Sequence, residues 1–318
     1  MIDRTVSTIE ARIRRRLRLR DLETLAAVAQ HGSMAKAAVH LSISQPAISK
    51  AIAEMEHALG VPLFDRMAQG VEPTIYGQVA LKWVAAIFDD LRQGAKEIEF
   101  LSDPTSGEVR IGAVEPMLGG FLAEVLKRLN DRFPRISFEV MQPVSLAQQR
   151  RELRERRVDL IVGRLADKDG SDEIASETLF EEPWSVVAGP NNPLTRRRKL
   201  RLSELTKEPW SLPPTDTVVS TYLARAFRAA GLEPPRAVVT CTSIQLHYAL
   251  MADGPFLAIF PRSLLRFGRY RLPIKILPVQ LPGPPPPVGI TTLKGRTRSP
   301  IVNLFIAEAR DVAKQLKD

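Results

Sequence analysis

Three polar residues near the start of one predicted helix have side chains that could bind DNA. Gln45, Ser49 and Lys50 fall on the helix face that is left over when the apolar residues of this segment pack inward. In a major groove, glutamine can hydrogen-bond to adenine, and lysine can bind guanine or a phosphate. The residues alone also allow a plainer interpretation, a helical hairpin with a solvated polar face.

The segments around these residues predict a helix-turn-helix. Residues 33–41 form a short predicted helix with Ser33 as its N-cap, and residues 42–44 interrupt it. Residues 45–56 form a second helix, in which Ser44 is a good N-cap and Pro46 is tolerated because first-turn amides lack intrahelical partners. The side chains predicted to face inward on the second helix are Ala47, Ile48, Ala51, Ile52 and Met55.

A predicted hairpin follows the second helix. Residues 59–66 and 71–73 are expected to be strands, and residues 67–70 a turn that ends in a glycine. A hairpin beside a helix-turn-helix is a wing. The wing weakens the interpretation as a simple helical hairpin and favours DNA binding.

Residues 77–101 predict a long linker helix. Apolar residues recur there at alternating spacings of three and four, which is the a/d pattern of a coiled-coil seam. The alternative is an ordinary amphipathic helix packed on its own domain. We favour a dimerisation seam, because a long helix between two domains must find a partner or stay exposed. The predicted seam residues are Leu81, Val84, Phe88, Leu91, Ala95 and Ile98.

The C-terminal part predicts an α/β domain with two lobes. From residue 108 onward, β-branched runs alternate with amphipathic segments, which is typical of βαβ units. Lobe I is expected to comprise about 107–178 and 280–318, and lobe II about 179–279. Strands at 276–281 and 288–293 are expected to return the chain to lobe I. Such crossings make the topology similar to that of the type 2 periplasmic binding proteins.

A ligand site is expected in the cleft between the lobes, because ligands of open α/β sheets bind outside the carboxyl ends of the strands. Arg164 would favour a negatively charged group and Glu115 would disfavour one, so organic acids and sugar-like polyols both remain open. Ser145 and Ser243 could equally be plain helix N-caps. The residues predicted to line the cleft are Glu115, Pro116, Met117, Ser145, Arg164, Thr215 and Ser243.

Composition and motifs argue against several other classes of protein. The 318 residues include 45 Lys and Arg against 36 Asp and Glu, a net charge of +9, and most of the excess lies beyond residue 101. No signal peptide or membrane-spanning stretch is recognisable, and a single cysteine forms no internal disulfide, so we expect a cytoplasmic protein. The four histidines lack metal-ligand spacing, and no catalytic or nucleotide-binding motif is found. We therefore expect no enzyme activity, cofactor or metal.

Two further features each have a plain and a sharper interpretation. Cys241 could be a redox sensor, but we expect a small buried apolar residue because no basic neighbour in the sequence would favour the thiolate. The proline run at 282–287 is predicted to be a stiff connector between strands and not a polyproline ligand.

Residues 17–78 resemble the DNA-binding head of the LysR-type transcriptional regulators. The matching positions occur in the family's order through the helix-turn-helix and the wing, and the resemblance extends over the whole chain from Leu17. The matching residues are Leu22, Gly32, Ser33, Ala37, Ala38, Leu41, the segment 44–50, Ile52, Glu56, Leu59, Gly60, Leu63, Phe64, Arg66, Thr74 and Gly77.

The resemblance implies a role for several of these side chains. The residues that would contact operator DNA are Gln45, Pro46, Ser49 and Lys50, with Ser33 meeting a phosphate and Arg66 in the wing steadying the DNA backbone. Met34, Lys50 and Pro73 depart from the usual family residues. The first two keep their chemistry, whereas Pro73 cannot donate a ladder hydrogen bond in the wing. Residues 1–16 lie outside the pattern, and their arginines are expected to be solvated more than DNA-bound.

The resemblance also implies an architecture and a function. Residues 1–76 would be a basic extension and a winged helix-turn-helix, 77–101 the dimerisation helix, and 102–318 the effector-binding domain. We expect a homodimer or homotetramer that binds double-stranded operator DNA, responds to a small-molecule effector and can contact RNA polymerase. The rival classes are a solute-binding protein, which the head and the absence of a signal peptide disfavour, and an enzyme.

Overall fold

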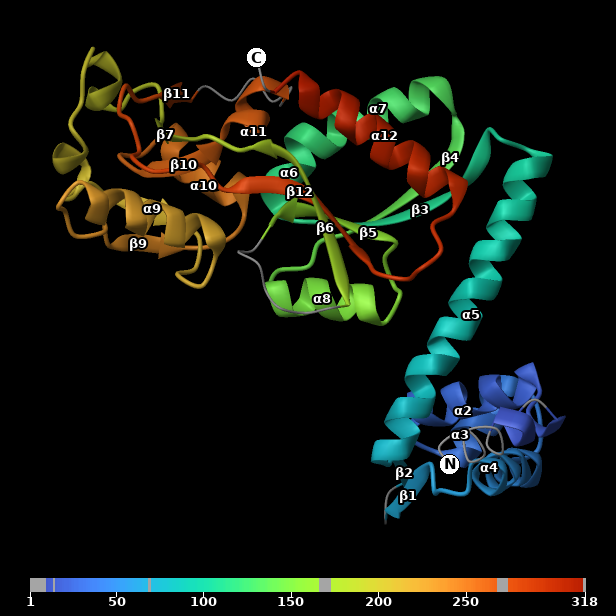
Figure 1. The fold of residues 1–318 in the computed structure, drawn as a ribbon. Coiled ribbons are helices and arrows are strands. Elements are labelled where there is room, and N and C mark those ends of the chain that lie inside the picture. Colours follow the sequence, from blue (N-terminus) through green and yellow to red (C-terminus); the bar gives the residue numbers. More distant parts are fainter. Residues whose placement is uncertain (1–9, 14, 68–69, 166–172, 268–273, 317–318) are drawn as a thin grey trace, which may run out of the picture. The chain divides into compact units, whose positions relative to one another are not determined.

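The structure is a computed structural model that describes residues 10–13, 15–67, 70–165, 173–267 and 274–316. The chain forms two compact units, Met1–Arg92 and Gln93–Asp318, and helix α5 (Ile75–Ser102) runs from the first into the second (Figure 1). None of the described helices is long and apolar enough to cross a membrane. Much of the predicted N-terminal extension and the tip of the wing lie outside the described residues.

Helices α2 (Leu19–His31), α3 (Met34–Leu41) and α4 (Gln45–Leu59) form the helix-turn-helix and its support. The hydroxyls of Ser33 and Ser44 cap α3 and α4 by accepting the backbone N–H of the third residue of each helix, at 3.4 Å in both cases. Ser42 adopts a left-handed φ of 56°, which closes the tight turn between α3 and α4. The sequence therefore sets the turn through residues at the helix ends.

The inward face of α4 is narrower than the sequence suggests. Ile48, Ile52 and Met55 are fully or almost fully buried in the core of the first unit. Ala51 is half-buried, but Ala47 is exposed, so its predicted inward position is wrong. Ala47 precedes Ile48 by one residue and therefore lies about 100° away around the helix, outside the buried stripe.

The wing consists of strands β1 (Phe64–Met67) and β2 (Gly70–Pro73), paired antiparallel. The N–H of Val71 donates to the carbonyl of Gly32 at 2.9 Å, which ties the wing to the end of α2. Gly70 has a φ of 146°, and a Cβ there would come within 2.2 Å of the Gly32 carbonyl oxygen. Pro73 is the last residue of β2, so its missing N–H interrupts no further pair of the ladder.

The apolar stripe of α5 divides into a buried and an exposed part. Val84 is 1% exposed and lies in the core of the first unit, against which Leu81 and Phe88 also pack. The exposed members of the stripe are Leu91, Ala95 and Ile98. Val84 therefore supports the head of its own chain, and of the predicted seam residues only those in the later part of the helix are exposed.

Lobe I of the second unit contains a mixed sheet in the order β4-β3-β5-β12-β6. The strands are β3 (Ser106–Ala113), β4 (Arg135–Met141), β5 (Leu160–Arg164), β6 (Ile174–Glu181) and β12 (Pro287–Leu293). Strand β3 is parallel to β4 and β5, whereas β12 is antiparallel to β5 and β6. Helices α7 (Ala123–Arg132) and α12 (Pro300–Lys314) cover one face, and α8 (Leu146–Arg154) covers the other (Figure 1).

Lobe II contains a second mixed sheet in the order β11-β7-β10-β8-β9. The strands are β7 (Trp184–Ala188), β8 (Trp210–Leu212), β9 (Ala237–Thr240), β10 (Leu257–Pro261) and β11 (Lys275–Ile276). Strand β8 is parallel to both β9 and β10. Helix α9 (Val218–Ala229) packs on one face, and α10 (Ile244–Ala252) and α11 (Arg262–Phe267) pack on the other.

Two expectations about strands fail in the second unit. Residues 276–281 were expected to return to lobe I, but β11 pairs with β7 and Leu277 is buried in the core of lobe II. The chain crosses later, through the proline run, where the carbonyl of Pro286 accepts the N–H of Glu182 at 3.1 Å. Strand β6 was not predicted, because most of its side chains are polar or only partly buried.

Asp159 is a buried carboxylate that joins separate segments of lobe I. It accepts hydrogen bonds from the guanidinium groups of Arg110 on β3, at 3.0 Å, and of Arg296 after β12, at 2.7 Å. The backbone N–H of Arg110 donates to its other oxygen at 2.9 Å. The side chains of Asp159 and Arg296 are only 3% and 4% exposed, so water cannot replace these bonds.

We expect Asp159→Ala to lower the free energy of unfolding by about 3–5 kcal/mol, because it leaves buried arginines without their carboxylate. Urea denaturation followed by circular dichroism measures this loss. Glu173→Ala is the control, since it removes an exposed pair with Arg154 and should cost less than about 1 kcal/mol. Equal losses for the two variants would contradict the role given to Asp159.

Candidate functional site

The N-terminal end of α4 is an exposed, mainly polar surface. Gln45, Pro46 and Ser49 are all exposed. Lys50 is exposed as well, and its Nζ lies 3.9 Å from the carboxylate of Glu54, a solvated pair that holds the cation only weakly. This end of the helix therefore offers hydrogen-bond donors, acceptors and a positive charge, which are the groups that base edges and phosphates require.

Ser33 and Arg66 belong to the same unit and remain accessible. The hydroxyl of Ser33 is partly exposed and accepts the N–H of Lys36 at the start of α3. A hydroxyl that accepts one bond still carries a proton that a phosphate oxygen can accept. Arg66 is exposed on β1 of the wing, where nothing in its strand covers the guanidinium.

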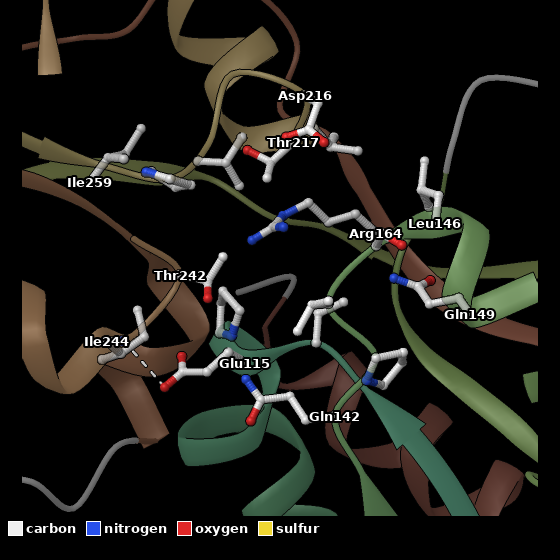
Figure 2. A pocket seen from close by; sticks show the side chains of 18 of the residues that line it. Glu115, Gln142, Leu146, Gln149, Arg164, Asp216, Thr217, Thr242, Ile244 and Ile259 are labelled. Carbon is white, nitrogen blue, oxygen red and sulfur yellow. Dashed lines mark hydrogen bonds between the residues drawn. The ribbon is translucent and has the colours of Figure 1, made fainter. Parts of the chain in front are cut away.

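A cavity of about 300 Å³ opens between the two lobes of the second unit (Figure 2). From lobe I it is lined by residues that follow β3, β4 and β5, among them Glu115, Gln142 and Arg164. From lobe II it is lined by residues that follow β8 and β9, including Pro213 and Thr242. The cavity therefore lies where the carboxyl ends of parallel strands from both sheets meet.

The structure brings together some of the predicted cleft residues and not others. Glu115, Pro116, Ser145 and Arg164 line the cavity, and the Ser145 hydroxyl also caps α8 by accepting the N–H of Gln148 at 3.1 Å. Met117 is buried in the core of lobe I, because it lies two positions after Glu115 and therefore about 200° away around the helix. Thr215 and Ser243 lie outside the lining; Thr215 is exposed and Ser243 caps α10.

Sequence reasoning missed several lining residues that have polar groups. Asp216, Thr217 and Thr242 lie in the loops expected to line the cleft, although Thr215 and Ser243 were chosen there as the site residues. The other polar residues were missed altogether, and they come from the end of β4, the first turns of α8 and α10 and the start of β7. They are Gln142, Gln149, Trp184 and His247.

Arg164 is the cation of the cavity, and it ends strand β5. Its guanidinium carbon lies 4.4 Å from the centroid of the Trp184 ring, a cation–π distance. Figure 2 shows its guanidinium pointing into the space between Thr217 and Thr242. Burial lowers the pKa of Arg164 to about 9, and the charge of nearby Glu182 opposes that shift, so the side chain is still a cation at neutral pH.

Glu115 connects the lobes across the cavity. One carboxylate oxygen accepts the N–H of Ile244, the first residue of α10, at 3.2 Å (Figure 2). The second oxygen is buried and has no hydrogen-bond partner among the described residues. Burial raises the pKa of Glu115, while the bond from Ile244 opposes the rise. Lobe I thus caps a helix of lobe II through a carboxylate whose charge is poorly solvated.

His247 is a buried, neutral histidine at the wall of the cavity. Its Nδ1 lies 2.7 Å from the Ser211 hydroxyl, and both ring nitrogens lie 3.7 Å from Sγ of Cys241. Burial lowers the pKa of His247 to about 4. A neutral imidazole places no positive charge beside the thiol, so this contact gives no reason for Cys241 to be a thiolate.

The described residues contain no group of three or more His, Cys, Asp or Glu side chains that could hold a metal ion. The lining of the cavity offers hydrogen-bonding groups, one arginine, two carboxylates and an apolar wall.

Two family models match the chain. Residues 19–78 match the model described as "Bacterial regulatory helix-turn-helix protein, lysR family". Residues 102–314 match the model described as "LysR substrate binding domain". The first match covers the helix-turn-helix and the wing, and the second covers both lobes and the cavity.

Known proteins align over most of the chain. The transcriptional regulator GbpR of Azospirillum brasilense is 29% identical over 299 residues, which are 94% of this chain and 87% of GbpR. GalR of Pseudomonas putida is 26% identical over 294 residues, 92% of this chain and 73% of GalR.

Solved structures share the fold. The LysR family regulator CbnR gives a TM-score of 0.63 at 20% identity, covering 93% of this chain and 99% of that chain. Full-length OxyR from Pseudomonas aeruginosa gives 0.66 at 19% identity, covering 94% and 97%. At these identities the likeness concerns the architecture of head, long helix and two-lobed domain.

The lowered pKa of His247 predicts a pH dependence of stability. Between pH 6.5 and 4 the unfolded chain binds this proton and the folded chain does not, so the contribution is complete above pH 6.5 and is lost as the pH falls. A shift from 6.5 to about 4 corresponds to about 3 kcal/mol of unfolding free energy. His247→Asn should remove that part of the acid destabilisation, as measured by urea unfolding from pH 7 to 4.

His57→Asn is the matched control, because His57 is exposed on α4 and its replacement should leave the pH profile of the wild type unchanged. Parallel profiles for the wild type and His247→Asn would show that burial of His247 does not control its protonation.

Proposed function

The chain belongs to the LysR family of transcriptional regulators, and from this premise we propose which of its side chains contact the operator and which hold the effector. The family combines a DNA-binding head with a domain that binds a small-molecule effector, and both are present here. The observation that carries the proposal is the exposed polar end of α4 in a capped helix-turn-helix.

On the head, Gln45 and Lys50 contact base edges in the major groove, with Pro46 and Ser49 packing beside them. Glutamine suits adenine, and lysine suits guanine or a neighbouring phosphate. Ser33 and Arg66 bind the DNA backbone from the start of α3 and from the wing. Exposed Ala47 adds a methyl group to the same end of α4, the kind of group that contacts the methyl of thymine.

In the second unit, the effector occupies the cavity between the lobes and changes how they are held. The bond from Ile244 to Glu115 is a contact between lobe I and lobe II at the wall of this cavity. An effector shifts the lobes only as far as its affinities for the two arrangements differ. An effector that weakens or strengthens the hydrogen bond between Ile244 and Glu115 has different affinities for the two arrangements.

The active form is a homodimer or homotetramer that acts in the cytoplasm on double-stranded operator DNA and contacts RNA polymerase. The exposed part of the α5 stripe, Leu91, Ala95 and Ile98, supports a seam with a second chain. We also propose that the protein is not an enzyme. Its family consists of regulators. Ser211 and Cys241, the hydroxyl and the thiol next to His247, do not line the cavity, so neither is placed there to attack a ligand.

The DNA contacts predict a selective loss of binding. The ligand is a duplex selected from random-sequence DNA by the wild-type chain, and affinity is measured by fluorescence anisotropy. Gln45→Ala should weaken binding by about 1–3 kcal/mol, because a base contact is lost. Lys50→Ala should weaken it too, and should lower the salt slope of log K by about 1 for each phosphate contact removed.

Lys82→Ala is the control, because Lys82 is an exposed lysine on α5 outside the helix-turn-helix. It should leave the preference for the selected sequence unchanged. If Gln45→Ala and Lys50→Ala bind that duplex as tightly as the wild type, α4 is not the element that contacts the operator.

A further inference from the structure

The cavity between the lobes contains a concentration of unsatisfied polar atoms. In the part of the chain that the structure describes, Nε and Nη2 of Arg164, Nε1 of Trp184 and Oε2 of Glu115 are buried without a hydrogen-bond partner. All three residues line this cavity. Buried donors without partners are rare in folded proteins and costly, so such a group indicates a missing partner.

Glu182 is the carboxylate whose charge acts on Arg164, but its own hydrogen bonds are made to another residue. Glu182 is 1% exposed, and its two oxygens accept the N–H of Ser263, at 3.0 Å, and the hydroxyl of Ser263. This arrangement holds Glu182 against the start of α11. The guanidinium edge of Arg164 that carries Nε and Nη2 is thereby left for another acceptor. The Trp184 ring packs on the face of the guanidinium, with its centroid 4.4 Å from the guanidinium carbon.

We propose that the effector is an organic acid whose single carboxylate binds side-on to Nε and Nη2 of Arg164. This inference rests on the proposed function of the cavity as the effector site, and it decides between the acid and the polyol that the sequence left open. Nε and Nη2 lie on one edge of the guanidinium, and two parallel N–H donors on such an edge match the two oxygens of a carboxylate.

The other residues of the lining indicate the polarity of the rest of the ligand. Most of it is apolar, with side chains such as Val114, Leu146, Val218, Ile244 and Ile259. A polyol would leave hydroxyl groups against this wall without partners, whereas a hydrocarbon or aromatic body would bury apolar surface there. The effector is therefore an acid with an apolar body, small enough for a cavity of about 300 Å³.

The charges of the cavity also limit the number of carboxylates. Besides Arg164, the charged side chains of the lining are the carboxylates of Glu115 and Asp216. A second carboxylate on the ligand would meet one of these like charges or lose its hydration against the apolar wall. Monocarboxylates should thus bind better than dicarboxylates of similar size.

Isothermal titration calorimetry of the full chain tests the inference with matched probes. Benzoate and hexanoate are the acids, benzamide and hexanamide their neutral counterparts, terephthalate the dicarboxylate, and glucose the polyol. We expect at least one monocarboxylate to bind, with its amide, terephthalate and glucose at least about tenfold weaker. Arg164→Gln should weaken the acid about 10- to 100-fold, the size expected for lost hydrogen bonds to a charged group.

Arg154→Gln is the matched control, because Arg154 is an exposed arginine of lobe I outside the cavity lining, and its replacement should not change acid binding. Arg164→Lys keeps the charge but loses the planar edge, and should also weaken the acid. The acid-to-amide preference of the wild type needs no variant, so it remains decisive even if Arg164→Gln fails to fold.

Three results would overturn the inference: no monocarboxylate binds, the amides or glucose bind as well as the acids, or Arg164→Gln binds the acid as the wild type does. Binding of the wild type to its selected DNA duplex is measured on the same preparation. DNA binding without any preference for acids would refute this inference alone, whereas loss of DNA binding would refute the proposed function of the head.

Discussion

The parallel pairing of β3 with both β4 and β5 is the constraint on which the cavity between the lobes depends. Parallel neighbours end at the same edge of a sheet, so Glu115, Gln142 and Arg164 meet although they are far apart in the sequence. In lobe II, β8 runs parallel to β9 and β10 and presents its own strand ends. The strand directions that build the two sheets therefore also collect the polar groups of the cavity.

Two sets of buried polar atoms in the second unit contrast with each other. Asp159 and Glu182 have their oxygens occupied by arginine, serine or backbone donors, and they hold segments of the chain together. Arg164 and Glu115 are buried as well, yet they retain atoms without partners, and both face the cavity. In the function we propose, the effector supplies the missing partner of such atoms.

The sequence predicts features that depend on a few neighbouring residues and misses those that depend on distant ones. Ser33 and Ser44 were correctly expected to cap their helices, because an N-cap acts on amides only three residues away. The topological rule correctly placed Arg164 at a cavity. Trp184 and His247 were missed because they reach it from the other lobe, on β7 and α10. Met117 and Ala47 were assigned to the wrong side, since one or two residues of rotation on a helix reverse a side chain's direction.

The distribution of charge shows why the net value of +9 identifies neither binding site. In the second unit many arginines form exposed pairs with carboxylates, as Arg154 does with Glu173 and Arg310 with Glu177. Solvent and salt weaken the interactions of such exposed charges. In the roles we propose, Lys50 would act through its place at the exposed end of α4, and Arg164 through a guanidinium edge whose Nε and Nη2 have no acceptor among the described residues. For recognition, the position and pairing of individual cations outweigh their number.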